Sequence, residues 1–507
     1  MFKNALVSVS DKTGLVEFLK PLAEQGLRIV STGGTAQHLK QAGLKVVDVS
    51  EQTGFPEVMN GRVKTLHPKV HMGLLARDIP EDLAVLKQNG IDAFDLVIVN
   101  LYPFEKTLIE KWKGANLSDA DMIEKIDVGG PSMIRAAAKS FQRISVVSDP
   151  RDYQWLAAKE KVTDEDRRIL AAKAFAHCAR YDSLISHYMG AFWGDETSFG
   201  GTKVQDLRYG ENPQQRATWY QFSGDIEGLH TAEILQGKTL SYNNILDLDA
   251  ASFLLQNLDE KSAVVVKHNN PCGAGTGDTL TEGLKRALDA DPVSAFGGIV
   301  ALGGQVTALE ADLLKNLFLE CIVAPSFAPE ALEIFKTKKN LRLLSWPQIF
   351  KAKRFFELKS VAGGFLVQSA DNLQMGTDGW QFLGEQPSPE ILRDLIFAEK
   401  VCASLKSNAI AIVSQGQTLG LGMGQVNRVD AVAQAIERMR THHAGKGTPV
   451  LASDAFFPFP DSIEKLAQAG IRWVIQPGGS VKDQDVFQAA RDLKVNLVIT
   501  GRRHFRH

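Results

Sequence analysis

The sequence predicts an α/β protein built from two α/β domains. Short apolar runs rich in β-branched residues alternate with segments of helical periodicity in both halves of the chain. A polar, glycine-rich stretch at residues 194–201 separates the halves, so we expect one domain at residues 1–195 and another at residues 202–507. The length of 507 residues agrees with this division, because it exceeds what a single hydrophobic core organises.

Composition excludes several classes of protein. The 57 basic and 59 acidic residues give a net charge of −2, which argues against a protein that coats nucleic acid. The start of the chain shows no signal peptide, and no apolar run is long enough to span a membrane, so we expect a cytoplasmic protein without a membrane partner. The cysteines at 178, 272, 321 and 402 are too far apart for a disulfide framework or a zinc knuckle, and we expect reduced thiols.

The first half reads as a parallel, doubly wound sheet, because strands alternate with helices along the chain. Residues 11–14 (DKTG) form a turn that can cap the first helix. We expect strands at residues 5–10, 27–31, 45–49, 94–100 and 143–148. We expect helices at residues 15–25, 36–41, 132–139 and 173–190.

Three loops of this half carry groups that suit a phosphate. The turns at residues 10–12 and 31–35 offer hydroxyls, glycines and Lys12 ahead of helices, although plain turn chemistry explains either one alone. The loop at residues 61–68 adds Arg62 and Lys64, which point the same way if the segment is extended. A solvated basic loop is the alternative.

Further polar groups follow at the same edge of the predicted sheet. Tyr102 comes after the strand at 94–100, and Asp127 precedes the helix at 132–139, on which Arg135 and Lys139 share a face. Taken together with the three loops, these groups predict a pocket for a phosphorylated small molecule.

The second half is organised around Lys267 and His268. They follow the β-branched run at residues 263–266, which is typical of a buried strand, and precede the glycine-rich residues 273–277, which we expect to form a loop. Catalytic groups in open α/β sheets gather at such strand ends. A structural or solvated lysine–histidine pair is the alternative reading of these two residues alone.

The rest of the second half again alternates strands and turns. We expect a surface turn at residues 207–215 and a polar loop at 241–244 ahead of an apolar helix that begins at residue 246. Residues 291–298 precede one strand, and Glu320 precedes another at 321–325. From residue 405 the pattern repeats, so this half is long enough for two subdomains. The repeat consists of polar residues 406–408, a strand at 409–413, glycine-rich residues 420–424, a helix at 431–438, strands at 450–453, 473–476 and 497–500, and the tail at 501–507.

Three apparent motifs fail on spacing. Lys238-Thr239 is not the end of a P-loop, because Ala232 stands where the first glycine is required. Residues 420–424 are not a dinucleotide fingerprint, because Gln425 replaces the last glycine. Pro271-Cys272 lacks the second cysteine of a zinc deaminase, since residue 275 is glycine and no HxE occurs.

Ordered motifs give the first half a family resemblance. Residues 8–14 (SVSDKTG), 31–35 (STGGT), 61–68 (GRVKTLHP), 100–104 (NLYPF) and 126–130 (IDVGG) resemble the inosine monophosphate (IMP) cyclohydrolase domain of the bifunctional purine biosynthesis family, whose fold is similar to methylglyoxal synthase. The resemblance implies that Lys64, Tyr102, Asp127 and Lys139 carry out ring closure. It also implies a ribose phosphate site made of Lys12, Ser31, Gly33, Gly34, Thr35, Arg62, Lys64 and Thr65.

The second half resembles the other domain of that family, the aminoimidazole carboxamide ribonucleotide (AICAR) transformylase, whose two subdomains are similar in fold to cytidine deaminases without the zinc. Residues 207–215, 267–273, 291–298, 406–410 and 503–507 match it. The resemblance implies catalysis by Lys267 and His268 and orientation of the formyl group by Asn408. It implies nucleotide contacts from Arg208, Tyr209, Asn244, Phe296, Gly297, Glu320, Arg428, Phe505 and His507. Asn427, where serine is usual, and Asn269, where threonine is common, leave details of nucleotide contact open.

The family resemblance implies two successive reactions. A formyl group passes from the cosubstrate 10-formyltetrahydrofolate to AICAR, and formyl-AICAR (FAICAR) then closes to IMP with loss of water. Neither step needs a redox cofactor or zinc, and a monovalent cation such as potassium is compatible with both. The resemblance also implies a homodimer. Two alternatives stay open, a methylglyoxal-synthase-like lyase, which leaves residues 267–273 unexplained, and a nucleotide-sensing protein, which needs no acid–base pair.

Overall fold

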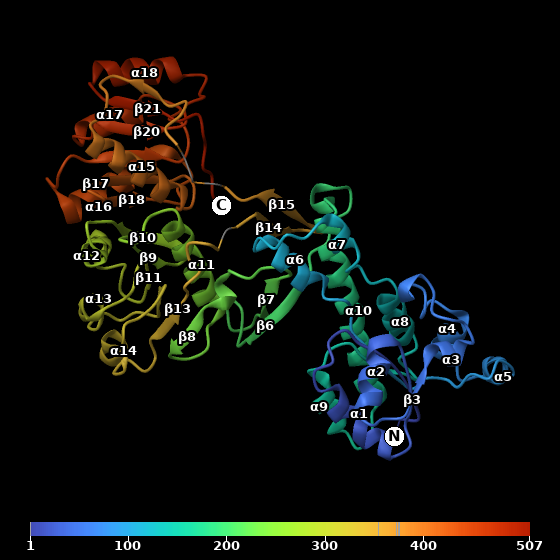
Figure 1. Cartoon of the computed structure of the whole chain (residues 1–507). Coiled ribbons are helices and arrows are strands. Elements are labelled where there is room, and N and C mark those ends of the chain that lie inside the picture. The colour runs from blue at the N-terminus through green and yellow to red at the C-terminus, as the bar shows by residue number, and fades with distance from the viewer. Residues whose placement is uncertain (1, 353, 372, 374–375) are drawn as a thin grey trace. The chain divides into compact units, whose positions relative to one another are not determined.

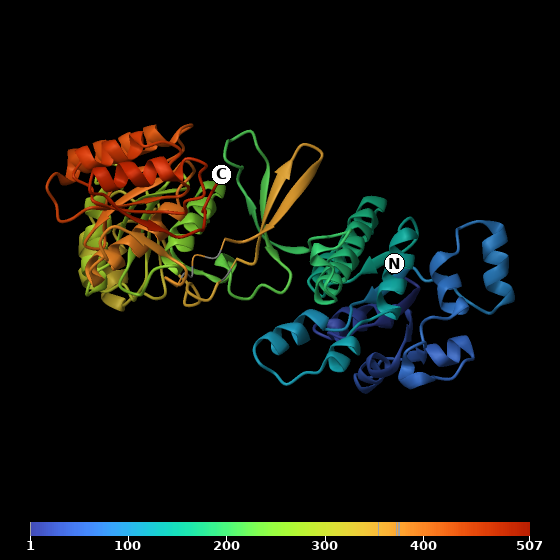
Figure 2. The ribbon, with the colours of Figure 1, turned by 90° about the horizontal axis from the view of Figure 1, so that it is seen from above.

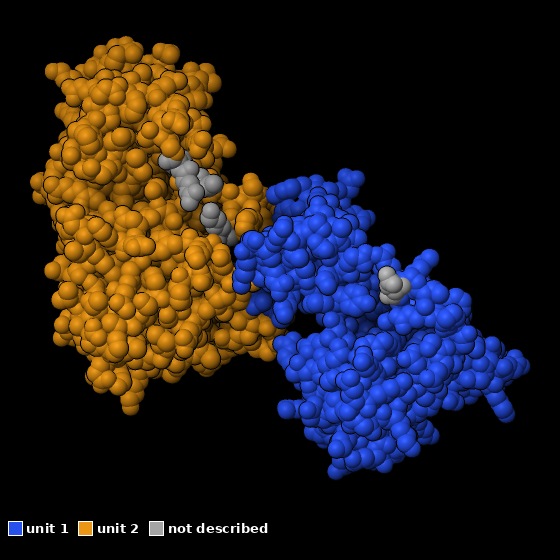
Figure 3. Space-filling view, in the orientation of Figure 1, with its two compact units in different colours: residues 1–202, 221–225 blue, residues 203–220, 226–507 orange. Residues whose placement is uncertain are grey.

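The computed structural model describes residues 2–352, 354–371, 373 and 376–507. The chain forms two compact units, shown in Figure 3. Unit 1 holds residues 1–202 and 221–225, and unit 2 holds residues 203–220 and 226–507. The hairpin of β6 (Gly201–Leu207) and β7 (Ala217–Phe222) lies across this division, so the chain passes between the units three times rather than once.

Unit 1 contains a five-stranded parallel sheet in the order β3-β2-β1-β4-β5, which is the doubly wound sheet that the sequence predicts. Its strands are β1 (Asn4–Ser8), β2 (Arg28–Ser31), β3 (Val46–Asp48), β4 (Leu96–Val99) and β5 (Ser145–Val147). Its helices are α1 (Leu15–Glu24), α2 (Gly33–Gln41), α3 (Val49–Thr53), η1 (Met59–Gly61), α4 (Pro68–Leu75), α5 (Pro80–Gln88), α6 (Phe104–Trp112), α7 (Asp119–Ile123), α8 (Gly129–Lys139), α9 (Asp152–Ala157), α10 (Asp164–Tyr188) and η2 (Ala191–Trp193).

The central strands of unit 1 are apolar on both faces because helices cover both sides. Every residue of β4 is buried, and β1 is buried over its first four residues. Buried side chains such as Leu6, Phe94 and Ile98 join the strands and helices into one core. Parallel strands place their carboxyl ends at one edge, and the loops that leave this edge carry the polar groups.

Unit 2 is built around a mixed twelve-stranded sheet in the order β16-β21-β20-β19-β17-β18-β10-β9-β11-β12-β13-β8. Its strands are β8 (Glu233–Gln236), β9 (Ala263–Lys267), β10 (Asn270–Gly275), β11 (Ile299–Leu302), β12 (Cys321–Ala324), β13 (Arg342–Ser345), β16 (Gln381–Leu383), β17 (Ile410–Ser414), β18 (Gln417–Gly422), β19 (Val450–Ser453), β20 (Trp473–Gln476) and β21 (Asn496–Ile499). Its helices are η3 (Leu229–Thr231), α11 (Tyr242–Gln256), α12 (Leu280–Ala290), α13 (Ala308–Leu314), α14 (Pro329–Phe335), α15 (Pro389–Ala403), α16 (Arg428–His443), α17 (Asp461–Gln468) and α18 (Asp483–Asp492).

The sheet of unit 2 repeats one arrangement twice, as the sequence pattern from residue 405 predicts. Hairpin β9–β10 is followed by the parallel strands β11, β12 and β13, and hairpin β17–β18 by the parallel strands β19, β20 and β21. An antiparallel strand closes each end, β8 beside β13 and β16 beside β21. The two repeats meet where β10 pairs with β18.

Helices cover both faces of this sheet. One core lies against α11 and α15 and includes residues from both repeats, while α12–α14 and α16–α18 each enclose a core of their own on the opposite face. A separate hairpin, β14 (Phe356–Val361) with β15 (Gly364–Ser369), extends away from the body of unit 2 (Figures 1 and 2). None of the helices in the described ranges is both long and apolar enough to cross a membrane.

The expectation that residues 273–277 form a loop is wrong for residues 273–275, which belong to β10, whereas residues 276–277 lie outside the strand. Gly273 and Gly275 lie within β10, and α12 packs so closely on them that a Cβ at Gly273 would lie 2.1 Å from the carbonyl oxygen of Ala287. In the second repeat, a Cβ at Gly422 of β18 would lie 2.0 Å from the carbonyl oxygen of Ala431. These glycines therefore permit helix–strand contact rather than ending a strand.

Candidate functional site

In unit 1, the loops after β1 and β4 are tied together by Asn100. Its Oδ1 accepts hydrogen bonds from the backbone N–H groups of Ser10 (2.6 Å) and Asp11 (2.9 Å), and its Nδ2 donates to the carbonyl of Asp11. This link fixes the segment that carries Lys12, whose Nζ lies 3.4 Å from the carbonyl of Ser10, beside the segment that carries Tyr102. Two predicted loops therefore meet at one edge of the sheet.

Lys64 faces the loop after β2. A Cβ at Gly33 would lie 2.8 Å from the Lys64 Nζ, so this ammonium group approaches the start of α2, and its charged partner is Glu57 at 3.7 Å. Residues 62–65 form turns in the predicted loop between η1 and α4, so the segment is not extended and the condition for Arg62 and Lys64 to point the same way is not met. Arg62 does not point alongside Lys64 but forms an exposed ion pair with Glu124.

Asp127 is the buried carboxylate of this edge. Its Oδ1 accepts the backbone N–H of Gly130 at 2.7 Å, at the start of α8. Burial raises the pKa of Asp127 above its usual value, although hydrogen bonds from the backbone of Gly130 and Tyr102 and the charge of Lys64 act in the opposite direction. Burial, followed by the charges of Asp127 and Glu57, raises the pKa of Tyr102. Lys64, Tyr102 and Asp127 thus form one electrostatic group.

The other residues predicted for the site in unit 1 differ in their burial and in their hydrogen-bond partners. Thr65 is buried with its Oγ1 near Gly129, Thr35 exchanges hydrogen bonds with the backbone of Val9, and Gly34 faces open space. Ser31 is fully buried and donates its hydroxyl to the carbonyl of Val7 at 2.7 Å.

Lys139 lies apart from this group. It ends α8, whose axis rises about 15 Å over ten residues, so it stands at the far end of that helix from Asp127. The described chain therefore does not bring Lys139 to Lys64, Tyr102 and Asp127.

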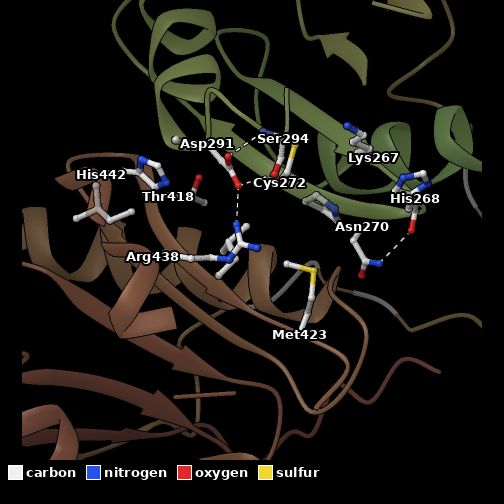
Figure 4. A pocket seen from close by; sticks show the side chains of 15 residues that line it. Lys267, His268, Asn270, Cys272, Asp291, Ser294, Thr418, Met423, Arg438 and His442 are labelled. Atoms are coloured by element: carbon white, nitrogen blue, oxygen red, sulfur yellow. Dashed lines mark hydrogen bonds and ion pairs between the residues drawn. The ribbon is translucent and has the colours of Figure 1, made fainter. Parts of the chain in front are cut away.

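In unit 2, Lys267 and His268 stand on the tight turn between β9 and β10 (Figure 4). His268 (φ 52°) and Asn269 (φ 64°) both adopt the left-handed conformation that a two-residue hairpin turn requires. The Lys267 Nζ donates to the carbonyl of Phe296 at 2.7 Å, and Gly297 (φ 76°) follows. The expectation of an adjacent lysine and histidine at the end of a buried strand is confirmed, although the connection is a turn and not an open loop.

A cavity of about 170 Å³ opens beside this turn, between the two repeats. Figure 4 shows Asp291, Ser294 and Cys272 on the first repeat facing Arg438 and His442 on the second. Burial raises the pKa of Asp291, but hydrogen bonds from Ser294 and the charge of Arg438, at 2.6 Å, outweigh it and lower this pKa below its usual value.

Cys272 lies in strand β10, is half-buried and lines the cavity. Burial raises the pKa of its thiol to about 12, which favours the protonated thiol at neutral pH and argues against a nucleophilic thiolate.

Asn408 and Arg428 form a connected polar group at the edge of the second repeat. The guanidinium of Arg428 donates to the Asn408 Oδ1 at 2.7 Å and forms a buried ion pair with Asp454. Asp454 also accepts the hydroxyl of Ser407 at 2.5 Å. This network joins to the first repeat, because the Asn270 Oδ1 accepts the backbone N–H of Lys406.

The C-terminal tail lies against the same loop. The backbone of Arg506 exchanges hydrogen bonds with Ser407, and the rings of Phe505 and His507 lie 5.6 Å apart. The predicted residues Phe505, His507, Asn408 and Arg428 thus come together around residues 406–408.

The remaining predicted residues have varied surroundings. Arg208 lies over the ring of Tyr209 at 5.6 Å in the loop between β6 and β7, and Glu320 pairs with Arg342 at 3.1 Å. The expected polar loop at 241–244 is instead a capping box that begins α11, with the Asn244 side chain bonded to Ser241. No group of three or more histidine, cysteine or acidic side chains among the described residues could hold a metal ion.

Comparison with known proteins agrees with this organisation. Residues 14–132 match the MGS-like domain family, and residues 137–438 match the family described as AICARFT/IMPCHase bienzyme. The bifunctional purine biosynthesis protein PurH of Desulfitobacterium hafniense (strain DSM 10664 / DCB-2) is 47% identical over 525 residues and covers 100% of both chains. PurH of Bacillus mycoides (strain KBAB4) is 47% identical over 518 residues with the same coverage. A solved structure, "Crystal structure of ForH", is 35% identical and covers 37% of this chain and 97% of its own, with a TM-score of 0.33.

The fold, the site and these matches define a bifunctional α/β enzyme with an MGS-like unit 1. The chain belongs to the AICARFT/IMPCHase bienzyme family, whose two activities are AICAR formyl transfer and IMP cyclohydrolysis. The full-length match favours this reading over both the lyase and the sensor.

The sequence does not single out several residues that hold the predicted ones in place. They are Asn100, Tyr181, Asp247, Asn270, Asp291, Arg438 and Asp454. Each bonds to a segment distant in the chain, and a single sequence shows no such pairing. Asp247 lies two residues before Asp249 in the same helix, so the sequence alone does not distinguish these two carboxylates.

Proposed function

We propose that this chain carries out the last two steps of de novo IMP synthesis, formyl transfer in unit 2 and ring closure in unit 1. The observation that supports this assignment most directly is the turn that presents Lys267 and His268 beside the cavity between the two repeats. Unit 1, by contrast, gathers Lys64, Tyr102 and Asp127 at the carboxyl edge of a parallel sheet. Each unit therefore has its own acid–base set.

In the proposed transfer, the amine of AICAR attacks the formyl carbon of 10-formyltetrahydrofolate. That amine is a poor nucleophile, because its lone pair is delocalised, so it must lose a proton as it attacks. His268 accepts this proton and returns one to the folate nitrogen as the bond from that nitrogen to the formyl carbon breaks. Lys267 stabilises the oxyanion that forms on the formyl oxygen, and Asn408 orients the formyl group.

Nucleotide binding in unit 2 is assigned to residues from several segments of the chain. The full-length family match supports the assignment, and the residues are Arg208, Tyr209, Asn244, Phe296, Gly297, Glu320, Arg428, Phe505 and His507. Arg428 is already satisfied by Asn408 and Asp454, so its main contribution is to fix Asn408.

In the proposed ring closure, the carboxamide nitrogen of FAICAR attacks the formamido carbon, and water then leaves. Orientation is the largest aid for so weak a nucleophile. Asp127 takes the amide proton, and Lys64 and Tyr102 stabilise the oxyanion. We assign the ribose phosphate to Lys12, Ser31, Gly33, Gly34, Thr35, Arg62 and Thr65, and a catalytic contribution to Lys139. Ser31 and Lys139 would have to change their present contacts or positions to take part.

Several further properties belong to the same proposal. The repeats of unit 2 are cytidine-deaminase-like subdomains, the protein is a cytoplasmic homodimer, and its partners are the nucleotides AICAR, FAICAR and IMP together with the folate. Neither reaction transfers electrons or requires a zinc-bound water, so no redox cofactor and no zinc is assigned. Potassium is compatible with the scheme, and a rate unchanged between potassium chloride and choline chloride would exclude a requirement for it.

The two-site assignment is tested by His268→Ala. We expect this variant to lose formyl transfer and to keep closure of supplied FAICAR at the wild-type rate, since His268 belongs to unit 2. The two reactions are followed separately, by tetrahydrofolate release and by IMP formation. Loss of both activities in a folded variant would contradict the assignment.

A further inference from the structure

The two repeats of unit 2 allow one hairpin to be compared with its counterpart. Ala263–Lys267 corresponds to Ile410–Ser414, and Asn270–Gly275 corresponds to Gln417–Gly422. Helix α11 precedes the first hairpin and α15 precedes the second, and both helices lie on the same face of the sheet. A feature shared by both hairpins is therefore part of the fold, whereas a feature of one alone can serve the reaction.

The turns of the two hairpins have the same backbone conformation. In the first, His268 has φ 52° and Asn269 has φ 64°, and in the second, Gln415 has φ 51° and Gly416 has φ 68°. A side chain in the left-handed region costs conformational free energy, so each turn needs partners that hold it there. Only the first turn carries a lysine and a histidine.

A carboxylate from the preceding helix holds each turn by its backbone. In the second repeat, Asp394 of α15 accepts the N–H of Gln415 at 2.6 Å and that of Gly416 at 2.8 Å. In the first repeat, Asp247 of α11 accepts the N–H of Asn269 at 2.6 Å, and the backbone and charge of the neighbouring His268 act to lower the pKa of Asp247. Burial raises the pKa of both carboxyls, while these backbone hydrogen bonds act to lower it.

We infer that Asp247 is a positioning residue for formyl transfer, which holds the turn so that Lys267 and His268 face the cavity. The inference rests on the proposed function of these two residues. Asp394 gives the second turn the same support without an acid–base pair. The carboxylate beneath the turn is thus purely structural in the second repeat, whereas in the first repeat it also fixes the position of the catalytic imidazole of His268.

The physical basis is the pairing of a carboxylate with backbone N–H donors of the turn, two at Asp394 and that of Asn269 at Asp247. The negative charge makes these bonds stronger than neutral ones. An asparagine at position 247 keeps one acceptor oxygen but loses the other and the charge. The turn then gains freedom, and His268 spends less time in the orientation that attack requires.

The test is a pair of matched substitutions, Asp247→Asn and Asp394→Asn, in the full-length chain. We expect Asp247→Asn to lower kcat for formyl transfer by about tenfold to a hundredfold, the range for a lost charged hydrogen bond. The KM values for AICAR and 10-formyltetrahydrofolate should change by no more than about twofold, and FAICAR closure should be unchanged. Asp394→Asn should lower the melting temperature about as much as Asp247→Asn does, while kcat for formyl transfer stays within about twofold of wild type.

Two outcomes overturn the inference. One is an equal loss of kcat in both variants, which would mean that the carboxylates act only through stability of the sheet. The other is a wild-type kcat in Asp247→Asn. If that variant does not fold, Asp247→Glu, which keeps the charge but moves it by one methylene, replaces it with the same expected loss of kcat. The His268→Ala variant separates this inference from the proposed function. If His268→Ala retains formyl transfer, both the inference and the proposed function are contradicted. If His268→Ala loses formyl transfer but Asp247→Asn keeps the wild-type kcat, only the inference is contradicted.

Discussion

The hydroxyl of Tyr181 accepts a hydrogen bond from the backbone N–H of Asp127 at 2.8 Å. The same hydroxyl donates to the carbonyl of Lys125 at 2.9 Å, so this side chain of α10 holds the loop that enters α8 from both sides. Asp127 therefore depends on a residue 54 positions later in the chain for its place beside Tyr102.

Replacing Tyr181 by phenylalanine should weaken ring closure and spare formyl transfer. The lost hydrogen bonds are worth about 1 kcal/mol each, so we expect kcat for FAICAR closure to fall by about fivefold to thirtyfold. The matched control is Tyr188→Phe on the same helix, whose hydroxyl donates to the exposed Asp119 at 2.7 Å. Steady-state rates of IMP formation check the prediction, and equal effects of the two substitutions would contradict it.

Asp127→Asn should lower the ring-closure activity and raise the stability of unit 1. The folded-state pKa of Asp127 is raised by burial, so its contribution to stability is present below its unfolded pKa and is lost as the pH rises through the folded value. At neutral pH the ionised carboxylate is therefore a cost, and we expect the variant to melt at a higher temperature while its ring-closure rate falls by at least about a hundredfold. Thermal melts below the usual aspartate pKa of about 3.9 and at pH 8 check this, and a gain at the lower pH as large as that at pH 8 would speak against it.

Glu399 should make the stability of unit 2 depend on pH. It is buried near the Nε2 of His504, at 3.9 Å, and burial raises its pKa to about 7. Its contribution to stability is therefore complete below the usual glutamate pKa and is lost as the pH rises through about 7. We expect Glu399→Gln to raise the free energy of unfolding by about 1 to 3 kcal/mol at pH 8.5 relative to wild type, and by much less at pH 5.

Urea denaturation at the two pH values measures this effect. The charged groups around Glu399 are His504, Asp371, Arg502 and Lys400, and none of them is altered in the variant. A difference between wild type and Glu399→Gln that does not change with pH would show that another group titrates.

Gly422→Ala should destabilise unit 2 by about 2 to 3 kcal/mol, because the new Cβ would meet the backbone of α16 rather than a flexible side chain. Gly364→Ala in β15 is the control, since nothing lies within 4 Å of a Cβ there. Denaturation midpoints of the two variants check the prediction. A Gly422→Ala protein as stable as Gly364→Ala would mean that α16 moves aside at little cost.

Much of the fold follows from sequence pattern. Residues 263–266 form a strand because all four are β-branched or small apolar residues, which suit a central strand that is buried on both faces of the sheet. The parallel order of unit 1 follows from strand–helix alternation. Both α2, at Gly33, and α11, at Tyr242, start earlier than expected. In α11 the reason is the capping box of Ser241 and Asn244, which begins the helix before its apolar pattern begins.

Other features depend on contacts that the sequence does not display. Gly273 and Gly422 read as loop formers, but each lies in a strand on which the next helix along the chain packs closely. Arg62 reads as a partner of Lys64, but Glu124, 62 positions away, decides where it points. The proposed catalytic pair at 267–268 is visible in the sequence, whereas the role of Asp247 in holding its turn is recognised only from the fold.

The threefold passage of the chain between the units limits how the two activities can be separated genetically. Residues 221–225 belong to unit 1, where the backbone of Gly224 bonds to Glu105 and a Cβ at that glycine would touch Trp112. A gene truncated after residue 195 would therefore encode an incomplete unit 1 with Glu105 and Trp112 uncovered. The shortest open reading frame that keeps every segment of unit 1 ends at Asp225, so the coding regions of the two units overlap and no single stop codon divides them cleanly.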